Sequence, residues 1–181
     1  MEEFTADDLV QSISEIPRVQ DMRWIHFEGR IPKVLQVAIP RLRELIPVCT
    51  FSLEIEKPDR RELLDLIPLI DIVFFSDTFY LHSGNETRST FFKTMRERSP
   101  TAVFILTAGK DGAYCSIPGM DLHVPTTEVV VVDAIGAGDT FIAGYISCAT
   151  KLGKAPLDCV KSAVALATKK VAQEGFDNLW T

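Results

Sequence analysis

The stretch VVVVDAIGAGDTF, residues 129–141, joins a run of four valines, a turn of small residues and the start of a periodic apolar segment. The valines predict a strand at Val129–Val132, and the periodic segment predicts a helix at Ala137–Lys151. A turn between a strand and a helix directs backbone N–H groups and the positive helix end at an anion. Gly136 and Gly138 lack Cβ atoms, so a phosphate could approach the main chain there. The stretch therefore predicts a phosphate-binding turn in an α/β protein.

Apolar runs rich in β-branched or aromatic residues continue this pattern through the chain. They predict buried strands at Met22–Phe27, Val48–Ile55, Ile72–Phe75 and Ala102–Thr107, and antiparallel or edge strands at Ala113–Ile117 and Asp121–Pro125. Apolar residues at helical spacing predict helices at Ile31–Ile46, Asp59–Ile67, Thr87–Arg98 and Pro156–Gln173. Pro40 predicts a kink or break near Val37 in the first of these helices. The alternation predicts right-handed βαβ units and a mostly parallel sheet covered by helices on both faces.

Length and composition favour a single domain over residues 1–181. The chain has 181 residues, 46% of them hydrophobic, which is enough for one core. With 19 basic and 25 acidic residues the net charge is −6, so nucleic acid is not an expected partner. The first residues lack the basic and apolar regions of a signal peptide, and no apolar run is long enough for a membrane span. We therefore expect no membrane partner and a cytoplasmic location.

Other nucleotide motifs do not fit the turn. No GxxxxGK[ST] string occurs in the chain, and the dinucleotide fingerprint GxGxxG fails because its third glycine falls on Phe141. Asp139 lies in the first helical turn, where a carboxylate commonly caps the helix. A carboxylate beside a bound phosphate is unfavourable unless a cation or a proton transfer is involved. Asp139 is therefore either a cap or the base of a phosphoryl transfer.

The pattern Asp133-x-x-Gly136-Ala137-Gly138-Asp139, followed by Ala143-Gly144, resembles the second signature of the ribokinase-like (phosphofructokinase B type) sugar kinases. The resemblance is strongest to the ketohexokinase (fructokinase) branch. It extends, in the same order, over Arg23–Arg30, Ser52–Pro58 and Gln173–Asp177. The resemblance implies a three-layer α/β/α fold with a mostly parallel sheet. It also implies a transferase that uses ATP and Mg²⁺ to phosphorylate a sugar hydroxyl, with a ketohexose such as fructose giving fructose 1-phosphate.

The resemblance also assigns roles to residues. Asp139 would be the catalytic base, and the N–H groups of Gly136, Ala137 and Gly138 would form the anion hole. The turn Gly109-Lys110-Asp111-Gly112 would lie along the nucleotide, although a simple hairpin turn would have the same sequence. Asp133 would fix the turn or help to bind a monovalent cation such as K⁺. Glu54 and Glu56 would face the magnesium waters, or form a solvated rim of the sheet.

Three features depart from the family pattern. Ala134 stands where a hydroxyl-bearing residue is common, and the Asn-x-x-Glu magnesium motif is missing at Ser76–Phe79. Residues 1–20 do not resemble the family's N-terminal strands, its sugar-binding residues or the β lid that forms its dimer contact. The chain thus resembles the C-terminal part of a sugar kinase, lacking the N-terminal strands and β lid, and its oligomeric state is not predicted.

Three functions remain open at this point. The chain could be a kinase that supplies the nucleotide half and the base. It could be a non-catalytic nucleotide-binding short isoform or decayed copy. It could also be a structural interaction domain, in which case GAGD is a coincidence.

Overall fold

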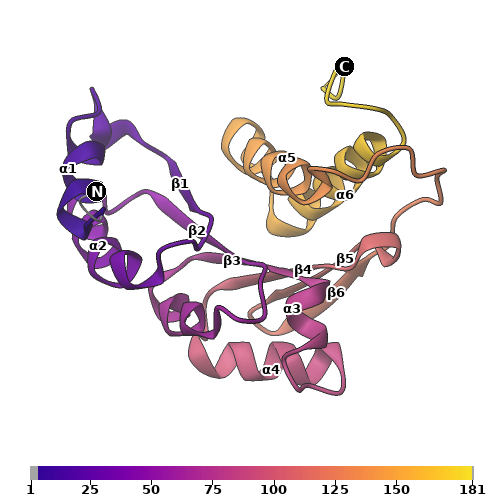
Figure 1. The fold of residues 1–181 in the computed structure, drawn as a ribbon, viewed down its shortest axis with the longest axis horizontal. Helices are drawn as coiled ribbons and strands as arrows, with labels where there is room; N and C mark the ends of the chain where they lie inside the picture. The colour runs from indigo at the N-terminus through magenta and orange to yellow at the C-terminus, as the bar shows by residue number, and fades with distance from the viewer. Residues whose placement is uncertain (1–3, 181) are drawn as a thin grey trace.

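The structure, a computed structural model, describes residues 4–180. Six strands form one sheet in the order of the sequence: β1 (Trp24–Phe27), β2 (Thr50–Ile55), β3 (Ile72–Ser76), β4 (Val103–Thr107), β5 (Ala113–Ile117) and β6 (Met120–Val124) (Figure 1). Strands β1 to β4 are parallel, whereas β5 and β6 pair antiparallel with their neighbours. The predicted mostly parallel sheet with antiparallel edge strands is therefore confirmed.

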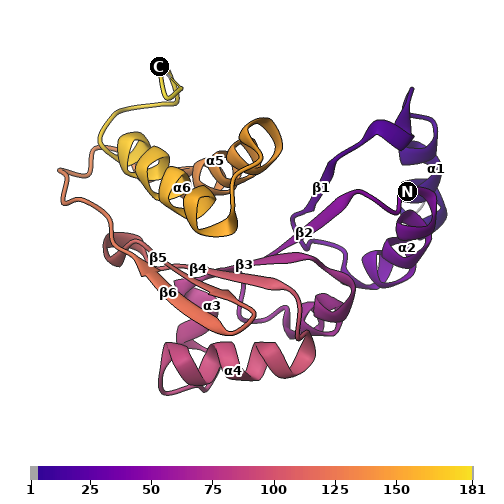
Figure 2. The same cartoon turned by 180° about the vertical axis from the view of Figure 1, so that it is seen from behind.

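Helices cover both faces of this sheet. Their bounds are α1 (Ala6–Ser14), η1 (Val19–Asp21), α2 (Pro32–Leu45), η2 (Arg61–Leu69), α3 (Asp77–Leu81), α4 (Arg88–Arg98), η3 (Gly109–Asp111), α5 (Ala137–Leu152) and α6 (Pro156–Val171), where η marks a 3₁₀ helix. Helices α5 and α6 lie together on one face, and α2 and α4 lie on the other, as the two opposite views in Figures 1 and 2 show. The fold is the three-layer α/β/α arrangement predicted from the sequence. No helix among residues 4–180 is long and apolar enough to cross a membrane.

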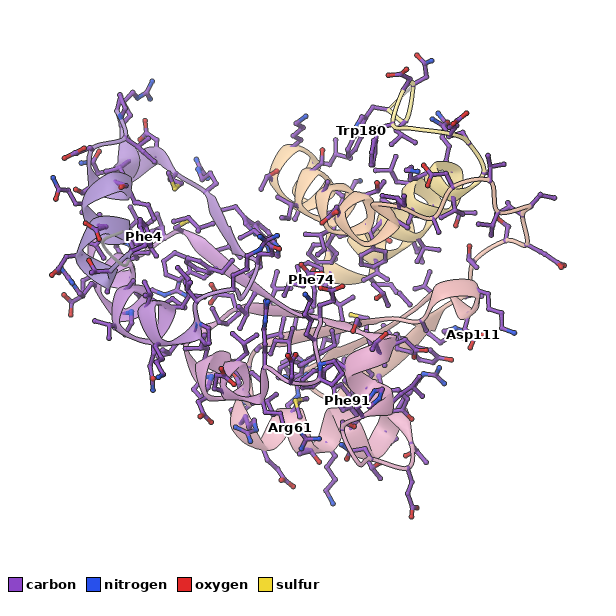
Figure 3. All side chains as sticks on the ribbon, in the orientation of Figure 1. Phe4, Arg61, Phe74, Phe91, Asp111 and Trp180 are labelled. Carbon is purple, nitrogen blue, oxygen red and sulfur yellow. The ribbon has the colours of Figure 1, made fainter. Side chains whose placement is uncertain are left out.

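Alternate side chains of the strands build two separate cores. Phe75 and Phe104 face α2 and α4 together with Phe91 of α4. Phe74 points to the other face and packs against Tyr145 of α5, with ring centres 5.4 Å apart. Figure 3 shows Phe74 and Phe91 on opposite sides of the sheet. This alternation fixes the position of α5 over β3.

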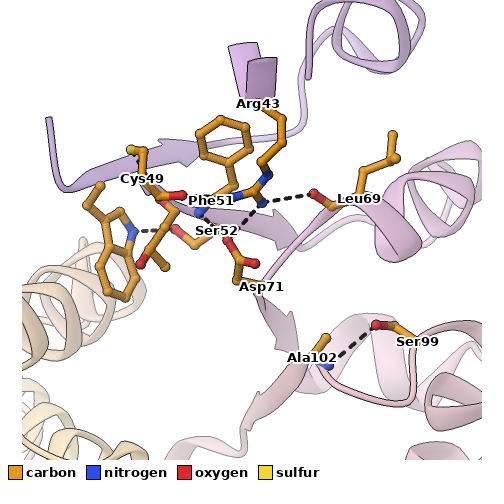
Figure 4. Close-up of polar contacts among 10 residues, drawn as sticks. Arg43, Cys49, Phe51, Ser52, Leu69, Asp71, Ser99 and Ala102 are labelled. Atoms are coloured by element: carbon orange, nitrogen blue, oxygen red, sulfur yellow. Dashed lines mark hydrogen bonds and ion pairs between the residues drawn. The ribbon is translucent and has the colours of Figure 1, made fainter. Parts of the chain in front are cut away.

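A polar cluster joins α2 to the amino ends of β2 and β3 (Figure 4). Arg43 donates from Nη1 to the carbonyl of Cys49 at 2.8 Å and from Nη2 to Oδ2 of Asp71 at 2.9 Å. The same Asp71 oxygen accepts the Phe51 N–H at 2.7 Å, and the guanidinium lies 4.0 Å from the centre of the Phe51 ring. The cluster secures the end of the sheet that lies away from the turn before α5.

The predicted strand at Val129–Val132 is wrong. These residues form an irregular segment, and Val130 is 83% exposed. The N–H of Val132 donates to the carbonyl of Val171 at the end of α6, and no strand of the described residues pairs with the segment. High β-propensity gives a strand only where a neighbouring strand accepts its hydrogen bonds.

Of the kink or break predicted near Val37, the break is wrong, because α2 continues through Pro40. Burial of Leu35, Ile39 and Leu42 against the sheet outweighs the one hydrogen bond that a proline removes. The predicted helix at Asp59–Ile67 is the 3₁₀ helix η2, which contains Pro68. The sequence analysis missed α1, although Thr5 and Asp8 form a capping box at its start.

Candidate active site

The turn before α5 has the geometry of an anion site. Gly136 is the N-cap residue of α5 with φ +73°, and its carbonyl accepts the N–H of Thr140 at 2.9 Å. The N–H of Ala137 donates to the carbonyl of Ala134 at 3.2 Å, so one of the three predicted anion-hole donors is already engaged. The next N–H groups of a helix have no partner within the helix and can face an anion.

The two glycines of the turn have different surroundings. A Cβ atom on Gly136 would lie 2.6 Å from Cζ of Phe176, and the positive φ is itself strained for any other residue. A Cβ atom on Gly138 would meet nothing within 4 Å. Gly136 is therefore needed for the conformation of the turn, whereas Gly138 leaves open space at the start of α5.

Asp139 does not act as a helix cap. It lies in the first turn of α5, which begins without a side-chain capping hydrogen bond among the described residues, and its side chain is exposed. The carboxylate thus stands at the helix end that favours negative charge. The capping alternative of the sequence analysis finds no support in this geometry.

Asp133 binds a lysine. Its Oδ2 atom lies 2.7 Å from Nζ of Lys170, and its Oδ1 atom accepts the N–H of Ile135 at 2.9 Å. The Lys170 hydrogen bond, followed by the Ile135 N–H, lowers the pKa of the Asp133 carboxyl below its ordinary value. These hydrogen bonds join Asp133 to the turn and to the end of α6. Both carboxylate oxygens are engaged by protein donors, which disfavours its expected role as a cation ligand.

A cavity of about 590 Å³ lies between the turn 109–112 and the start of α5. Gly109, Lys110 and Gly112 line it together with Ala137 and Gly138. Residues 113–135 separate these two turns in sequence, and the fold brings them to one space of the size that small-molecule ligands occupy.

Asp111 does not line this cavity. Its Oδ2 atom lies 3.7 Å from Nη2 of Arg88, at the outer side of the turn that Figure 3 labels. Gly112 has φ +85°, and a Cβ atom there would lie 2.1 Å from the carbonyl oxygen of Val124. The turn is thus packed against the end of β6, and only its inner residues face the cavity.

The sequence analysis missed most of the cavity wall. Val129 and Val131 of the irregular segment line the cavity, and α6 contributes Val164, Ala167 and Val171. The spacing of the α6 residues places them on one helix face, and this spacing was the signal in the sequence that could have identified them. The exposed valines that were predicted as a strand instead form an apolar wall beside the predicted phosphate-binding turn.

Glu54, near the carboxyl end of β2, lies in an acidic region with Asp139. The pKa of Glu54 is raised to about 7 by burial, and then by the nearby charges of Glu56, Asp139 and Glu28. Glu54 therefore lies within electrostatic reach of both Glu56 and the predicted base Asp139. Asp133 is not among the charges that act on Glu54.

The fit of Mg²⁺ to this acidic region can be judged from its donors. Among residues 4–180 no three acidic, histidine or cysteine side chains are close enough to enclose a metal ion. Mg²⁺ does not need such a cage beside phosphates, because it keeps several waters and takes one or two carboxylates. Glu54 and Glu56 fit that limited role.

Comparison with known proteins identifies a family of carbohydrate kinases. Residues 47–181 match the family described as pfkB family carbohydrate kinase. Ketohexokinase of Mus musculus is 31% identical over 166 residues, which are 87% of this chain and 55% of that protein. The chain thus spans just over half the length of this relative.

Solved structures agree on the fold. A double mutant of fructokinase from Vibrio cholerae, bound to fructose, ADP and potassium, superposes with a TM-score of 0.72 at 22% identity, covering 92% of this chain and 60% of that one. Aminoimidazole riboside kinase from Salmonella enterica, complexed with aminoimidazole riboside and an ATP analogue, gives a TM-score of 0.69 at 21% identity, covering 87% of this chain and 59% of that one. The fold, the GAGD turn and the family match together establish that this chain belongs to the pfkB family of carbohydrate kinases.

Proposed function

We propose that the chain binds ATP in the cavity between the turn 109–112 and α5 and supplies the base for transfer of the γ-phosphoryl group to a sugar hydroxyl. The observation that carries this proposal is the open space at Gly138, which adjoins the cavity lined by Gly109 and Gly112. An apolar wall of Val129, Val131 and α6 suits the base of a nucleotide, and the start of α5 suits its phosphates. We treat residues 1–181 as one partial carbohydrate kinase domain.

In the proposed reaction Asp139 accepts the proton of the attacking hydroxyl as the new O–P bond forms, and the bond from the γ-phosphorus to the β,γ-bridging oxygen breaks, so that ADP leaves. The N–H groups at the start of α5, with Gly138 among them, stabilise the charge on the transferred group. Mg²⁺, when bound, would neutralise phosphate charge beside Glu54 and Glu56. Most of the catalytic effect would come from positioning and electrostatics, as in other phosphoryl transfers.

A ketohexose is the proposed substrate, with fructose 1-phosphate as the product. Support comes from the 31% identity to the mouse ketohexokinase. A monovalent cation at Asp133 is not part of the proposal, because Lys170 already binds that carboxylate. The alternative is a nucleotide-binding protein without sugar kinase activity of its own. This alternative remains because the chain covers only 55% of the length of that relative.

Two measurements on the chain test these functions. Isothermal titration with a non-hydrolysable ATP analogue and Mg²⁺ should show one site, and absence of binding would contradict both the kinase and the alternative. A coupled assay for ADP with fructose then separates them. ADP release that depends on fructose supports the kinase, whereas binding without turnover supports the alternative.

A further inference from the structure

Lys170 at the end of α6 is buried in a way that is unusual for a lysine. It is 0% exposed, and it is the only charged residue among the buried residues that the structure describes. Its Nζ atom lies 2.7 Å from Oδ2 of Asp133 and 3.1 Å from the main-chain oxygen of the same residue. The ring of Phe176 lies beneath it, with the ring centre 4.9 Å from Nζ.

Burial of this ammonium group is not explained by stability alone. Removing an ammonium ion from water is costly, and an apolar side chain of similar size commonly serves a buried position at least as well. Both of these Lys170 hydrogen bonds go to one residue, Asp133, which begins the phosphate-binding turn. Because the Asp133 carboxylate neutralises the charge, Lys170 would act on a phosphate through the position of the turn and not through its own field.

Asp133, held by Lys170, also makes hydrogen bonds to the turn and to the segment after α6. Its Oδ1 atom holds the N–H of Ile135 at 2.9 Å, and its Oδ2 atom also accepts the N–H of Gly175 at 3.4 Å. Next to Gly175, Phe176 packs against Gly136 so closely that a Cβ atom there would lie 2.6 Å from its ring. Lys170 thus connects α6, the turn 133–138 and the segment 175–176.

We propose that Lys170 is a positioning residue for phosphate binding. By holding Asp133 it keeps the turn 133–138 in the conformation that leaves Gly138 open at the start of α5. The inference rests on the proposed function for its ligand, the phosphates of ATP. Its structural part, the ordering of the turn by Lys170, can be tested without any ligand.

The test compares Lys170→Met with Lys161→Met, a control that removes an exposed lysine of the same helix. Lys161 lies 3.6 Å from Asp158 and does not reach the turn. Amide hydrogen exchange is followed at Ile135 and Thr140, whose N–H groups are hydrogen-bonded within the turn and at the start of α5. In Lys170→Met we expect these amides to exchange at least tenfold faster and the dissociation constant of the ATP analogue with Mg²⁺ to rise at least tenfold. Lys161→Met should leave both unchanged.

Lys170→Met leaves the Asp133 charge without its partner and could unfold the chain. The double variant Asp133→Asn/Lys170→Met removes both charges and keeps an oxygen for the N–H of Ile135. We expect it to melt close to the unmodified chain but to retain the faster exchange at Thr140 and the tenfold weaker nucleotide binding. If this folded double variant shows the same exchange rate at Thr140 and the same dissociation constant for the ATP analogue as the unmodified chain, the inference is overturned. If the unmodified chain binds no ATP analogue, the proposed function fails, and the exchange rates alone decide the role of Lys170.

Discussion

Gly138→Ala should separate the stability of the fold from nucleotide binding. A Cβ atom at this position meets nothing within 4 Å, and the residue lies in α5 without the positive φ that Gly136 has. Alanine is favoured over glycine in a helix by roughly 0.5–1 kcal/mol. For a domain of this size such a gain raises the Tm by roughly 1–4 °C. The variant should therefore be slightly more stable than the unmodified chain.

Binding should change in the opposite direction. A phosphate oxygen that accepts an N–H at the start of α5 would lie about 2.9 Å from the nitrogen, so a methyl group in the same open space would crowd it. We expect the affinity for a non-hydrolysable ATP analogue to fall at least tenfold, which corresponds to about 1.4 kcal/mol. Thermal melting and isothermal titration on the same sample give both quantities.

Gly136→Ala is the matched control. Its φ of +73° is strained for alanine by roughly 1–2 kcal/mol, and its Cβ atom would lie 2.6 Å from the Phe176 ring. This variant should lower the Tm, whereas Gly138→Ala should raise it. If Gly138→Ala is more stable and binds the analogue with unchanged affinity, the phosphate lies elsewhere. A lower Tm for Gly138→Ala would refute the open space at that position.

Three further variants test other parts of the structure. Asp139→Asn should reduce sugar-dependent turnover on the order of 10²-fold or more with nearly unchanged ATP affinity, because a base acts only once the hydroxyl attacks; surviving turnover would exclude that role. The pKa of Glu54 is raised to about 7 in the folded protein, compared with 4.5 in the unfolded chain. Between these pH values the folded protein therefore holds a proton that the unfolded chain has released, and the free energy of unfolding should fall as the pH rises. Glu54→Gln should therefore melt higher than the unmodified chain at pH 8 and equally at pH 4, and equal melting at pH 8 would contradict the raised pKa. Arg43→Met should lower the free energy of unfolding by about 1–3 kcal/mol in a denaturant titration, since the carbonyl of Cys49 and the carboxylate of Asp71 lose their donor, and an unchanged midpoint would refute this role.

The sequence determined the layer arrangement and the location of the glycine turn that precedes α5. Strand-like runs alternating with helix-like periods leave few arrangements other than a parallel sheet between two helix layers. The turn 136–138 was likewise predictable, because glycines between an apolar run and a helix allow backbone conformations and close approaches that other residues do not. Thr5 and Asp8 carried the signal of α1 as well, although the sequence analysis did not use it.

Tertiary contacts decided the features that local preference predicted wrongly. Val129–Val132 has high β-propensity, yet it forms no strand, because no strand of the described residues pairs with it and the N–H of Val132 donates to the end of α6. Pro40 was expected to kink or break α2, yet the helix does not break, because its apolar face is buried on the sheet.

The partners within the site also depended on the tertiary structure. The sequence offered Asp133 as a residue that fixes the turn or binds a cation, and only the fold placed the buried Lys170 against it. The two residues lie 37 positions apart, with α5 and most of α6 between them. A local pattern specifies the conformation of a few neighbouring residues, whereas the packing of α6 against the turn determines which distant charge is buried beside that carboxylate.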